Sequence, residues 1–498
     1  MKLAVFSTIL ALVAAPALAQ SVKAAVEGGV IVGTETATAA IYRNIPYAAA
    51  PVGPLRWAPP AKVTPWTGER DGTKAGVSCM QTMRADGAPN SGSANGPMSE
   101  DCLQLSVFAP KGASKAPVMV WLHGGSHRYG AGWIYDGSNF ARDGVVLVAI
   151  NYRLGPLGYF AHPALTKAAG SGEAVGNYGL MDQIAALEWV KRNIRTLGGD
   201  PANVTVFGES AGGGSTLALL ATPKSKGLYQ KAVVQSGGGW SAPTTLADKE
   251  AEGVKAAAAL GLTAPTADQL RAVPAADLIA KAQGDFGPFV DGALMKQTPA
   301  QAFATGRAHD VPLIIGSNSG EDSLMSEFGL GPAAVGKALP PAVRAIYVEE
   351  AAQSDEVLGR AVFTDRAFGA PARWTAAKAA KGKPAWLYHF SYVGSRFRPM
   401  VTRAFHAAEI QYVFEYWGRR TPISMIKPDD QAMATLMHGC WVAFAKTGKP
   451  DCAGWPAYDP GSDQLMEFGA PSGVRTNFRK SRLDAQEAAA LPTLELAK

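Results

Sequence analysis

The middle of the chain alternates short apolar runs, rich in β-branched residues, with longer runs that have a helical period. Apolar runs without an alternating polar face indicate strands that are buried on both sides. Such strands belong to a mostly parallel sheet that helices cover on both faces, so the sequence predicts an α/β fold. The expected strands lie in residues 116–125, 144–153, 203–207, 229–237, 311–320 and 385–392, and the expected helices in 182–193 and from about 211.

Two Ala- and Pro-rich stretches, residues 239–310 and about 326–380, interrupt this alternation and have helical character. Ligands of open parallel sheets bind beyond the carboxyl ends of the strands. We expect both stretches to be helical insertions over this rim, where they form the walls and cap of a pocket. No linker separates them from the rest of the chain, so residues 20–498 are predicted to form a single domain.

The first 19 residues have the pattern of an export signal. Lys2 supplies a charged start, residues 3–15 are apolar, and Ala17-Leu18-Ala19 has the small residues of a cleavage site. The apolar stretch is short for crossing a bilayer, and no later segment is a candidate for doing so. We predict cleavage after Ala19 and a secreted or periplasmic protein; the alternative is an uncleaved anchor.

Four cysteines, none with the C-x-x-C spacing of a metal site, are expected to form disulfides in an exported protein. Three pairings are possible, and we favour the local one, which joins Cys79 with Cys102 and Cys440 with Cys452. The net charge of +6 is spread thinly, without a run of five basic residues. We therefore expect no nucleic-acid partner and no polybasic membrane contact.

Residues 208–212 read GESAG and connect the expected strand 203–207 with a helix-compatible run. A serine between two glycines at such a turn is held on backbone so tight that only glycine fits beside it. The turn pushes the hydroxyl of Ser210 out to where a substrate can reach it. The alternative is an ordinary glycine-rich loop, so the interpretation depends on the rest of the rim.

A serine hydroxyl is a poor nucleophile until an imidazole removes its proton. Of the seven histidines, His406 best fits this base because it lies in a loop that follows every other rim element. Glu321, directly after the strand 311–320, is the candidate carboxylate that orients the imidazole, and Asp322 is its rival. Glu321 has a second interpretation, since an acid at this position also caps a helix.

The tetrahedral intermediate of acyl transfer carries an oxyanion that backbone N–H groups stabilise. Ala211, which follows the candidate nucleophile, supplies one such group. The glycine turn at residues 123–126, HGGS, supplies others, because glycine lets the backbone approach a substrate without a Cβ in the way.

Several longer segments resemble the signatures of type-B carboxylesterases, the group that also holds the cholinesterases and bile-salt-activated lipases. The resemblance runs from about residue 27 to 480 and rests on segments that occur in the family's order. They are YRNIPYAAAPVGPLRWAPP, SEDCLQLSVFAP, GNYGLMDQIAALEWVKRNIRTLGGDPANVTVFGESAGG, AVVQSG, FVDGALM, GSNSGEDS, FHAAEIQYVF and WVAFAKTGKPDCAGWPAYD. The resemblance implies an α/β-hydrolase fold and serine-esterase activity.

The same resemblance implies a catalytic triad with Ser210 as the nucleophile, Glu321 as the acid and His406 as the base. The implied oxyanion-hole positions are Gly125, Ser126 and Ala211, and the implied supporting positions are Gly124, Glu209 and Ser236. The family's first disulfide corresponds to Cys79–Cys102, whereas Cys440–Cys452 is less standard. The implied mechanism needs no metal ion and no organic cofactor.

Departures from the family pattern lie beside the oxyanion turn and the base. Ser126 stands where the family usually has Gly or Ala, and His127-Arg128 follows where an aromatic residue is usual. Arg403 lies three residues before His406 and adds a second cation. We therefore predict substrate contacts from these three side chains and a preference for esters that carry carboxylates, which an arginine fork binds bidentately. The alternative is that the arginines are solvated surface residues.

The sequence thus predicts a serine carboxylic-ester hydrolase that acts on a small-molecule ester through an acyl-enzyme on Ser210. One alternative is a binding or adhesion protein on the same fold, since some relatives have lost the nucleophile. A closer alternative is a lactonase or amidase with the same mechanism. The acyl and alcohol preferences and the oligomeric state are left open by the sequence.

Overall fold

The computed structural model describes residues 20–418, 421–452 and 454–496, so the predicted export signal at 1–19 lies outside the described residues. The main sheet has thirteen strands, and its seven central strands are parallel to one another. In their order across the sheet they are β9 (Val146–Ile150), β8 (Ala116–Leu122), β10 (Gly199–Glu209), β11 (Lys231–Gln235), β12 (Leu313–Asn318), β13 (Ala385–Phe390) and β14 (Gln464–Phe468). The predicted α/β fold with a mostly parallel sheet is confirmed, although several expected strands are shorter than the apolar runs.

Antiparallel strands extend this sheet at both edges, and the sequence analysis did not predict them. The first two of them in the chain bury only one and two of their seven residues, so they have no continuous buried apolar run by which to recognise them. The added strands are β1 (Gln20–Val26), β2 (Gly29–Glu35), β3 (Ala39–Pro46), β4 (Glu69–Asp71), β7 (Gln104–Pro110) and β15 (Gly473–Thr476); β4 alone is parallel to its neighbour, and β5 (Ser78–Cys79) and β6 (Met98–Ser99) form a separate pair.

Side chains of the central strands alternate between two apolar clusters, one on each face of the sheet. In β8, Val118 and Val120 belong to the first cluster, whereas Met119 and Trp121 belong to the second. Because both faces are apolar, both need a layer of helices, which is why these strands read as uninterrupted hydrophobic runs.

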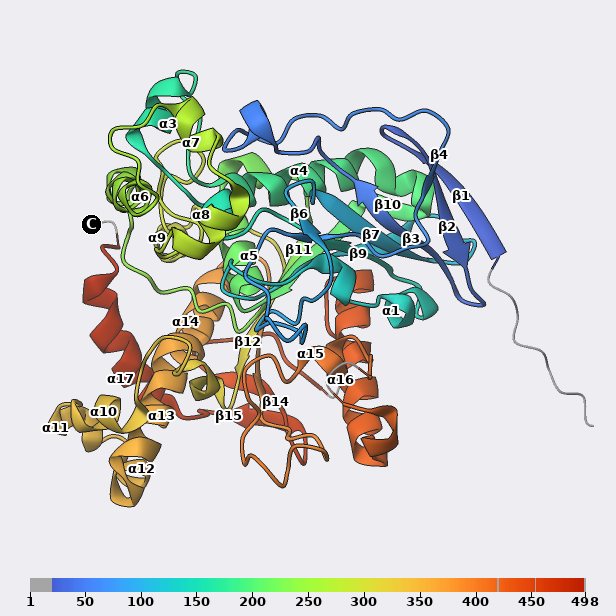
Figure 1. Cartoon of the computed structure of the whole chain (residues 1–498). Coiled ribbons are helices and arrows are strands. Elements are labelled where there is room, and N and C mark those ends of the chain that lie inside the picture. Colours follow the sequence, from blue (N-terminus) through green and yellow to red (C-terminus); the bar gives the residue numbers. More distant parts are fainter. Residues whose placement is uncertain (1–19, 419–420, 453, 497–498) are drawn as a thin grey trace, which may run out of the picture.

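Helices cover each face of the sheet. The first face carries α4 (Tyr178–Asn193), α5 (Ala211–Ala221) and α14 (Ala370–Ala379). The second carries α1 (Ser138–Arg142) and α16 (Pro428–Thr447), so that α4 and α16 lie on opposite sides of the sheet in Figure 1. The helix predicted at 182–193 ends where expected but begins four residues earlier.

The two insertions are helical, as the sequence predicts, and Figure 1 shows them at the left of the sheet, above and below the level of α5. The first insertion holds α6 (Leu246–Ala259), α7 (Ala267–Arg271), α8 (Ala275–Lys281) and α9 (Pro299–Ala304). The second holds α10 (Pro332–Lys337), α11 (Pro341–Arg344), α12 (Val348–Gln353), α13 (Asp355–Thr364) and a π-helix, Asp365–Gly369, that leads into α14. The remaining helices are α2 (Gly155–Gly158), α3 (Pro163–Ala168), α15 (Ile410–Val413) and α17 (Lys480–Ala490).

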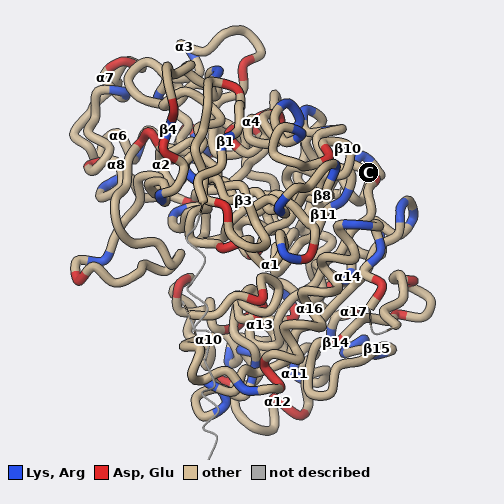
Figure 2. The backbone as a smooth tube through the Cα atoms, turned by 90° about the vertical axis from the view of Figure 1, so that its right-hand side faces the viewer, with Lys and Arg blue, Asp and Glu red and all other residues tan. Residues whose placement is uncertain are grey.

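Two disulfides join Cys79 with Cys102 and Cys440 with Cys452, which is the local pairing. Disulfides of this kind are typical of extracellular or periplasmic proteins. Among the described residues, no helix combines the length and apolar character that crossing a membrane requires. Basic and acidic residues are interspersed along the chain in the view of Figure 2.

Candidate active site

Ser210 lies at the junction of β10 and α5, in a backbone conformation with φ 56° and ψ −124° that non-glycine residues rarely adopt. The flanking glycines are required by space. A Cβ on Gly212 would lie 2.0 Å from the carbonyl oxygen of Leu122, and a Cβ on Gly208 would lie 2.5 Å from the backbone of Gly212. The strand-to-helix turn is therefore compact enough to raise the serine above both elements, as the GESAG pattern predicts.

His406 and Glu321 meet at the carboxyl edge of the sheet. Nδ1 of His406 donates a hydrogen bond of 2.5 Å to Oε2 of Glu321. Glu321 follows β12 and His406 follows β13, and these strands are parallel neighbours, so their following loops emerge at the same edge. The N–H of Gly320 also donates to the carbonyl oxygen of Ala404 at 2.7 Å, which ties the two loops together.

The other oxygen of the Glu321 carboxylate, Oε1, has hydrogen-bond donors of its own. Oε1 accepts hydrogen bonds from the hydroxyl of Ser236 at 2.6 Å and from the N–H of Asn318 at 2.7 Å. Glu321 is fully buried, so each carboxylate oxygen has its own fixed partners and Oε2 faces the imidazole. This arrangement selects the tautomer with the proton on Nδ1 and leaves Nε2 of the neutral ring able to accept a proton.

A second carboxylate lies at the far nitrogen of the same ring. Oε1 of Glu209 is 3.1 Å from Nε2 of His406, so the imidazole points toward the turn that carries Ser210. This nitrogen is buried and makes no hydrogen bond with any residue in the described ranges. Burial lowers the pKa of His406, but the charges of Glu209 and Glu321 outweigh it and raise that pKa to about 9.

The glycine turn after β8 packs directly against the serine turn. A Cβ on Gly124 would lie 2.8 Å from a carboxylate oxygen of Glu209 and 3.0 Å from Cβ of Ser210, so only glycine allows this approach. Nδ1 of His123 lies 2.8 Å from the carbonyl oxygen of Gly124, and the ring stacks on Tyr152. Burial lowers the pKa of His123 to about 4, so the ring is neutral and serves to shape the turn.

Three backbone N–H groups beside Ser210 remain available. Among the described residues, none accepts a hydrogen bond from the N–H of Gly125, Ser126 or Ala211. Gly125 and Ser126 both have positive φ, 103° and 55°, which turns the backbone of the loop away from strand geometry. Unpaired N–H groups at one edge of a turn form the kind of site that receives a developing negative charge.

A model of the carboxylesterase family matches residues 19–486, nearly the whole chain. The chain belongs to the carboxylesterase family. The match covers the serine turn, the acid and the histidine loop together, and it makes the protein a carboxylic-ester hydrolase with the α/β-hydrolase fold.

Two curated relatives of this carboxylesterase are named esterases, and the chain matches most of the length of each. It is 35% identical over 480 residues to fumonisin B1 esterase from Sphingopyxis macrogoltabida, which covers 87% of this chain and 84% of the relative. It is 36% identical over 450 residues to para-nitrobenzyl esterase from Bacillus subtilis (strain 168), covering 84% and 88% of the two chains. A solved PNB esterase structure matches with a TM-score of 0.80 at 32% identity, over 93% of this chain and 99% of the other.

Each of the three side chains that the sequence predicts as substrate contacts interacts with other residues of the chain. His127 of the carboxylesterase is buried, its Nε2 lies 2.9 Å from Oγ of Ser215, and burial lowers its pKa to about 3. Arg128 donates to the carbonyl oxygen of Gly284 and lies over the ring of Phe286. Arg403 pairs with Asp322 at 2.9 Å.

Asp322, the alternative to Glu321 as the carboxylate that orients His406, therefore has a different role in the carboxylesterase. Its buried carboxylate accepts from Arg403 and also from Arg360 of α13, at 2.9 Å in both cases. It links the loop that carries His406 with the second insertion. This role could not be predicted from the sequence, because neither arginine lies near Asp322 in the chain.

Glu409 is a further buried acid that the sequence analysis did not single out. Its carboxylate accepts hydrogen bonds from Nδ2 of Asn318 at 2.6 Å and from Nε2 of Gln235 at 2.9 Å. Burial raises the pKa of Glu409, and the charge of Glu321 raises it further. An acid within the mostly apolar segment FHAAEIQYVF was the available sequence signal.

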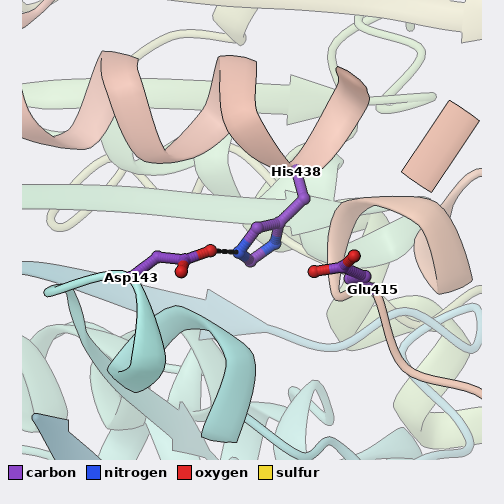
Figure 3. Close-up of side chains that lie close together, drawn as sticks. All are labelled: Asp143, Glu415 and His438. Carbon is purple, nitrogen blue, oxygen red and sulfur yellow. Dashed lines mark hydrogen bonds and ion pairs between the residues drawn. The ribbon is translucent and has the colours of Figure 1, made fainter. Parts of the chain in front are cut away.

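One group of metal-ligating side chains occurs in the described part of the carboxylesterase, formed by Asp143, Glu415 and His438. Figure 3 shows the carboxylate of Asp143 directed at the His438 ring, with Glu415 beside it. Oδ2 of Asp143 is 3.0 Å from Nε2 of His438, and Nδ1 of that ring lies 2.7 Å from the carbonyl oxygen of Val413. Arg142 pairs with both carboxylates at 2.6 Å, so a protein cation already contacts both acids of this group.

Two cavities of the carboxylesterase lie along the segment that follows Ser236. One has a volume of about 280 Å³ and is lined by His127, Gly214, Gly237 and residues of the first insertion. The other has a volume of about 560 Å³ and is lined mainly by the second insertion. Trp240 and Ser241 line both cavities, so the segment that follows Ser236 forms their common wall.

Proposed function

We propose that this carboxylesterase hydrolyses its ester through a covalent acyl-enzyme on Ser210, with His406 as the base and Glu321 as the acid. The observation that carries the proposal is the 2.5 Å hydrogen bond between Glu321 and His406, with Nε2 directed toward the serine turn. The strained backbone of Ser210 and the glycine contacts around it support the same assignment.

The first half-reaction forms the acyl-enzyme. The Ser210 hydroxyl oxygen attacks the ester carbonyl carbon while its proton moves to Nε2 of His406. Glu321 and Glu209 stabilise the imidazolium that results, and the C–O bond of the leaving alcohol breaks as the alcohol takes the proton from Nε2. Water then attacks the acyl carbon, with His406 again accepting a proton, and the acid leaves as Ser210 is restored.

We assign the oxyanion hole to the N–H groups of Gly125, Ser126 and Ala211, with Gly124, Glu209 and Ser236 in supporting positions. The absence of acceptors for these three N–H groups among the described residues supports the assignment. The groups that contact the oxyanion are backbone N–H groups. Ser126 therefore keeps its N–H donor, although it has a hydroxymethyl side chain where the family usually has the hydrogen of Gly or the methyl group of Ala. The mechanism uses no metal ion and no organic cofactor.

The finer substrate proposal is a preference for esters that carry carboxylates. Arg128 and Arg403 flank the site, and Arg403 is about one-third exposed, with a side-chain exposure of 36%. The test compares Arg128→Ala and Arg403→Ala on an anionic ester and on its neutral analogue. A rise in KM for the anionic ester alone supports the proposal, whereas an equal change for both esters shows that the arginines only hold the protein together.

We also propose that residues 1–19 are an export signal cut after Ala19 and that residues 20–498 form one domain. The two disulfides support a location in the periplasm or outside the cell. The partner is a small-molecule ester, and we propose no nucleic-acid partner.

The test of the catalytic proposal is hydrolysis of p-nitrophenyl acetate by the mature protein and by Ser210→Ala. We expect kcat to fall by a factor on the order of 10⁶ in the variant, with an unchanged melting temperature. Labelling by an organophosphonate, located by peptide mass spectrometry, must fall on Ser210. Labelling elsewhere, or an equal rate in the variant, contradicts the assignment. Lactone and anilide analogues of the same acyl group separate esterase from lactonase and amidase activity.

A further inference from the structure

The π-helix Asp365–Gly369 connects the candidate active site with the larger cavity. Its Phe368 ring lies 5.5 Å from the ring of His406, measured between centroids. Two residues earlier, Arg366 lines the cavity of about 560 Å³. π-Helical turns are rare and occur often at functional sites, because the extra residue re-aims the neighbouring side chains.

The position of this π-helix is fixed by buried polar contacts. Asp365, which is 1% exposed, accepts hydrogen bonds from the Tyr347 hydroxyl at 3.0 Å and from the Arg479 guanidinium at 3.1 Å. These contacts fix the first residue of the π-helix, so the backbone that carries Arg366 and Phe368 is held in place. A site built on an anchored turn keeps its geometry when a ligand enters.

The cavity has the size and lining of a small-molecule site, since such sites commonly have volumes of about 300–1,000 Å³ and mostly apolar walls. Its walls come from α10, α13, the C-terminal segment and the segment after β11. Apolar side chains dominate them, including Trp240, Leu330, Leu339, Phe363 and Leu494.

Arg366 is the charged residue of this lining. Its side chain is exposed, and within the described ranges it makes no hydrogen bond and no ion pair. The neighbouring arginines differ, since Arg360 and Arg403 both pair with Asp322. A cation without a protein partner beside an apolar cavity is suited to an anionic group on a ligand whose remainder is apolar.

The cavity is also joined to the triad by the chain that supports Glu321. Ser236 bonds to Glu321, and the same segment continues to Trp240 and Ser241 in the cavity wall. A Cβ on Gly238 would lie 3.5 Å from the carbonyl oxygen of Ala367, so this segment packs against the π-helix. Two segments of the chain therefore run from the reacting centre to the cavity, one through Ser236 and one through the π-helix.

We propose that this cavity receives one arm of the ester, an apolar chain that ends in a carboxylate, and that Arg366 binds that carboxylate. The proposal rests on the proposed esterase function and adds the location and shape of the anion-binding subsite. It predicts that the enzyme selects for a terminal anion that an apolar chain separates from the ester carbonyl, in addition to any anion bound near Arg128 and Arg403.

The experiment uses two p-nitrophenyl esters of one eight-carbon dicarboxylic acid, the first with a free terminal carboxylate and the second with a terminal methyl ester. The hydrolysis of both esters is measured with the wild-type protein, with Arg366→Gln and Arg366→Lys, and with the control variant Arg307→Gln. Arg307 is an exposed arginine after α9 that is not in the lining of this cavity. Melting temperatures of all four proteins are measured in parallel.

We expect Arg366→Gln to lower kcat/KM for the carboxylate ester by about tenfold or more, mainly through KM, because a charge-assisted hydrogen bond is lost. For the methyl ester, kcat/KM of Arg366→Gln should stay within about twofold of the wild-type value. On the carboxylate ester, Arg366→Lys should recover part of the lost kcat/KM, and added salt should reduce the difference between the wild type and Arg366→Gln. Arg307→Gln should behave as the wild type.

An equal effect of Arg366→Gln on both esters, or none on either, overturns the subsite. A selective effect of Arg307→Gln overturns it as well, because the cause is then general surface charge. Failure of the proposed function is distinct: in that case the folded wild-type protein hydrolyses neither ester and Ser210 takes no organophosphonate label.

Discussion

Oε1 of Glu209 lies 3.1 Å from Nε2 of His406, at the opposite ring nitrogen from Glu321. The imidazole is thus placed between two buried carboxylates, one on each of its nitrogens. Both favour the protonated ring, which stabilises the imidazolium of the reaction but also raises the pH at which the free base is present.

Glu209→Gln tests this balance. The charges of Glu209 and Glu321 raise the pKa of His406 to about 9 against the opposing effect of burial, and the base acts only in its neutral form. Activity should therefore rise with pH toward that value. Removing the Glu209 charge lowers the pKa, so the acidic limb of the kcat/KM profile should move to lower pH while the plateau falls. Glu327→Gln, at an exposed position, should leave the profile unchanged.

Ser236→Ala tests the support of Glu321, the proposed acid of the triad. The variant loses the 2.6 Å hydrogen bond to Oε1 of Glu321 and leaves one N–H donor there. A hydrogen bond to a charged group contributes about 1.5–3 kcal/mol, so we expect kcat to fall roughly ten- to a hundredfold with little change in KM. The control is Ser225→Ala, which removes a buried hydroxyl bonded to Leu219 away from the triad. Equal kcat losses in both variants would point to general destabilisation.

Asp322→Asn tests the link between the histidine loop and the second insertion. Asp322 is buried and pairs with two arginines whose side-chain exposures are 34% and 36%. Because solvent partly screens these ion pairs, each stabilises the protein less than a fully buried pair would. We expect the free energy of unfolding to fall by about 2 kcal/mol. Asp429→Asn breaks the exposed pair with Arg398 and should cost less than about 1 kcal/mol. Denaturant titrations measure both, and a larger loss in Asp429→Asn would contradict the assignment.

Gly212→Ala tests the steric origin of the serine turn. The added Cβ would lie 2.0 Å from the carbonyl oxygen of Leu122, and overpacking of this kind costs about 1–3 kcal/mol. We expect the variant to lose stability and, through the displaced Ser210, most of its activity. Gly214→Ala, two residues along the same helix, meets its first neighbour at 3.5 Å and should be tolerated. Thermal melts and p-nitrophenyl acetate hydrolysis distinguish the two variants.

Local patterns were sufficient for the central sheet and made Ser210, Glu321 and His406 candidates at its edge, whereas their proposed roles came from the family resemblance. The buried parallel strands form continuous apolar runs, and their carboxyl ends meet at one edge whatever the details of the loops. The antiparallel edge strands escaped prediction because strands such as β1 bury few of their residues. Their pairing depends on neighbours that are distant in the chain.

The partners of charged side chains were decided by tertiary structure. The sequence showed no partner for Arg403, yet Asp322 pairs with it and also with Arg360 of the second insertion. Glu409 appeared as one acid in an apolar run, yet two amides enclose it behind the triad.

The sequence by itself determined the fold class, because it depends on one repeated strand pattern, and it supplied the candidate nucleophile turn and the order of the proposed triad. Only the tertiary structure decided which arginines are paired, which one lines a cavity, and how His406 is placed between two carboxylates. Long charged side chains reach partners across loops, and the folding of the whole chain is what brings those partners within hydrogen-bond distance.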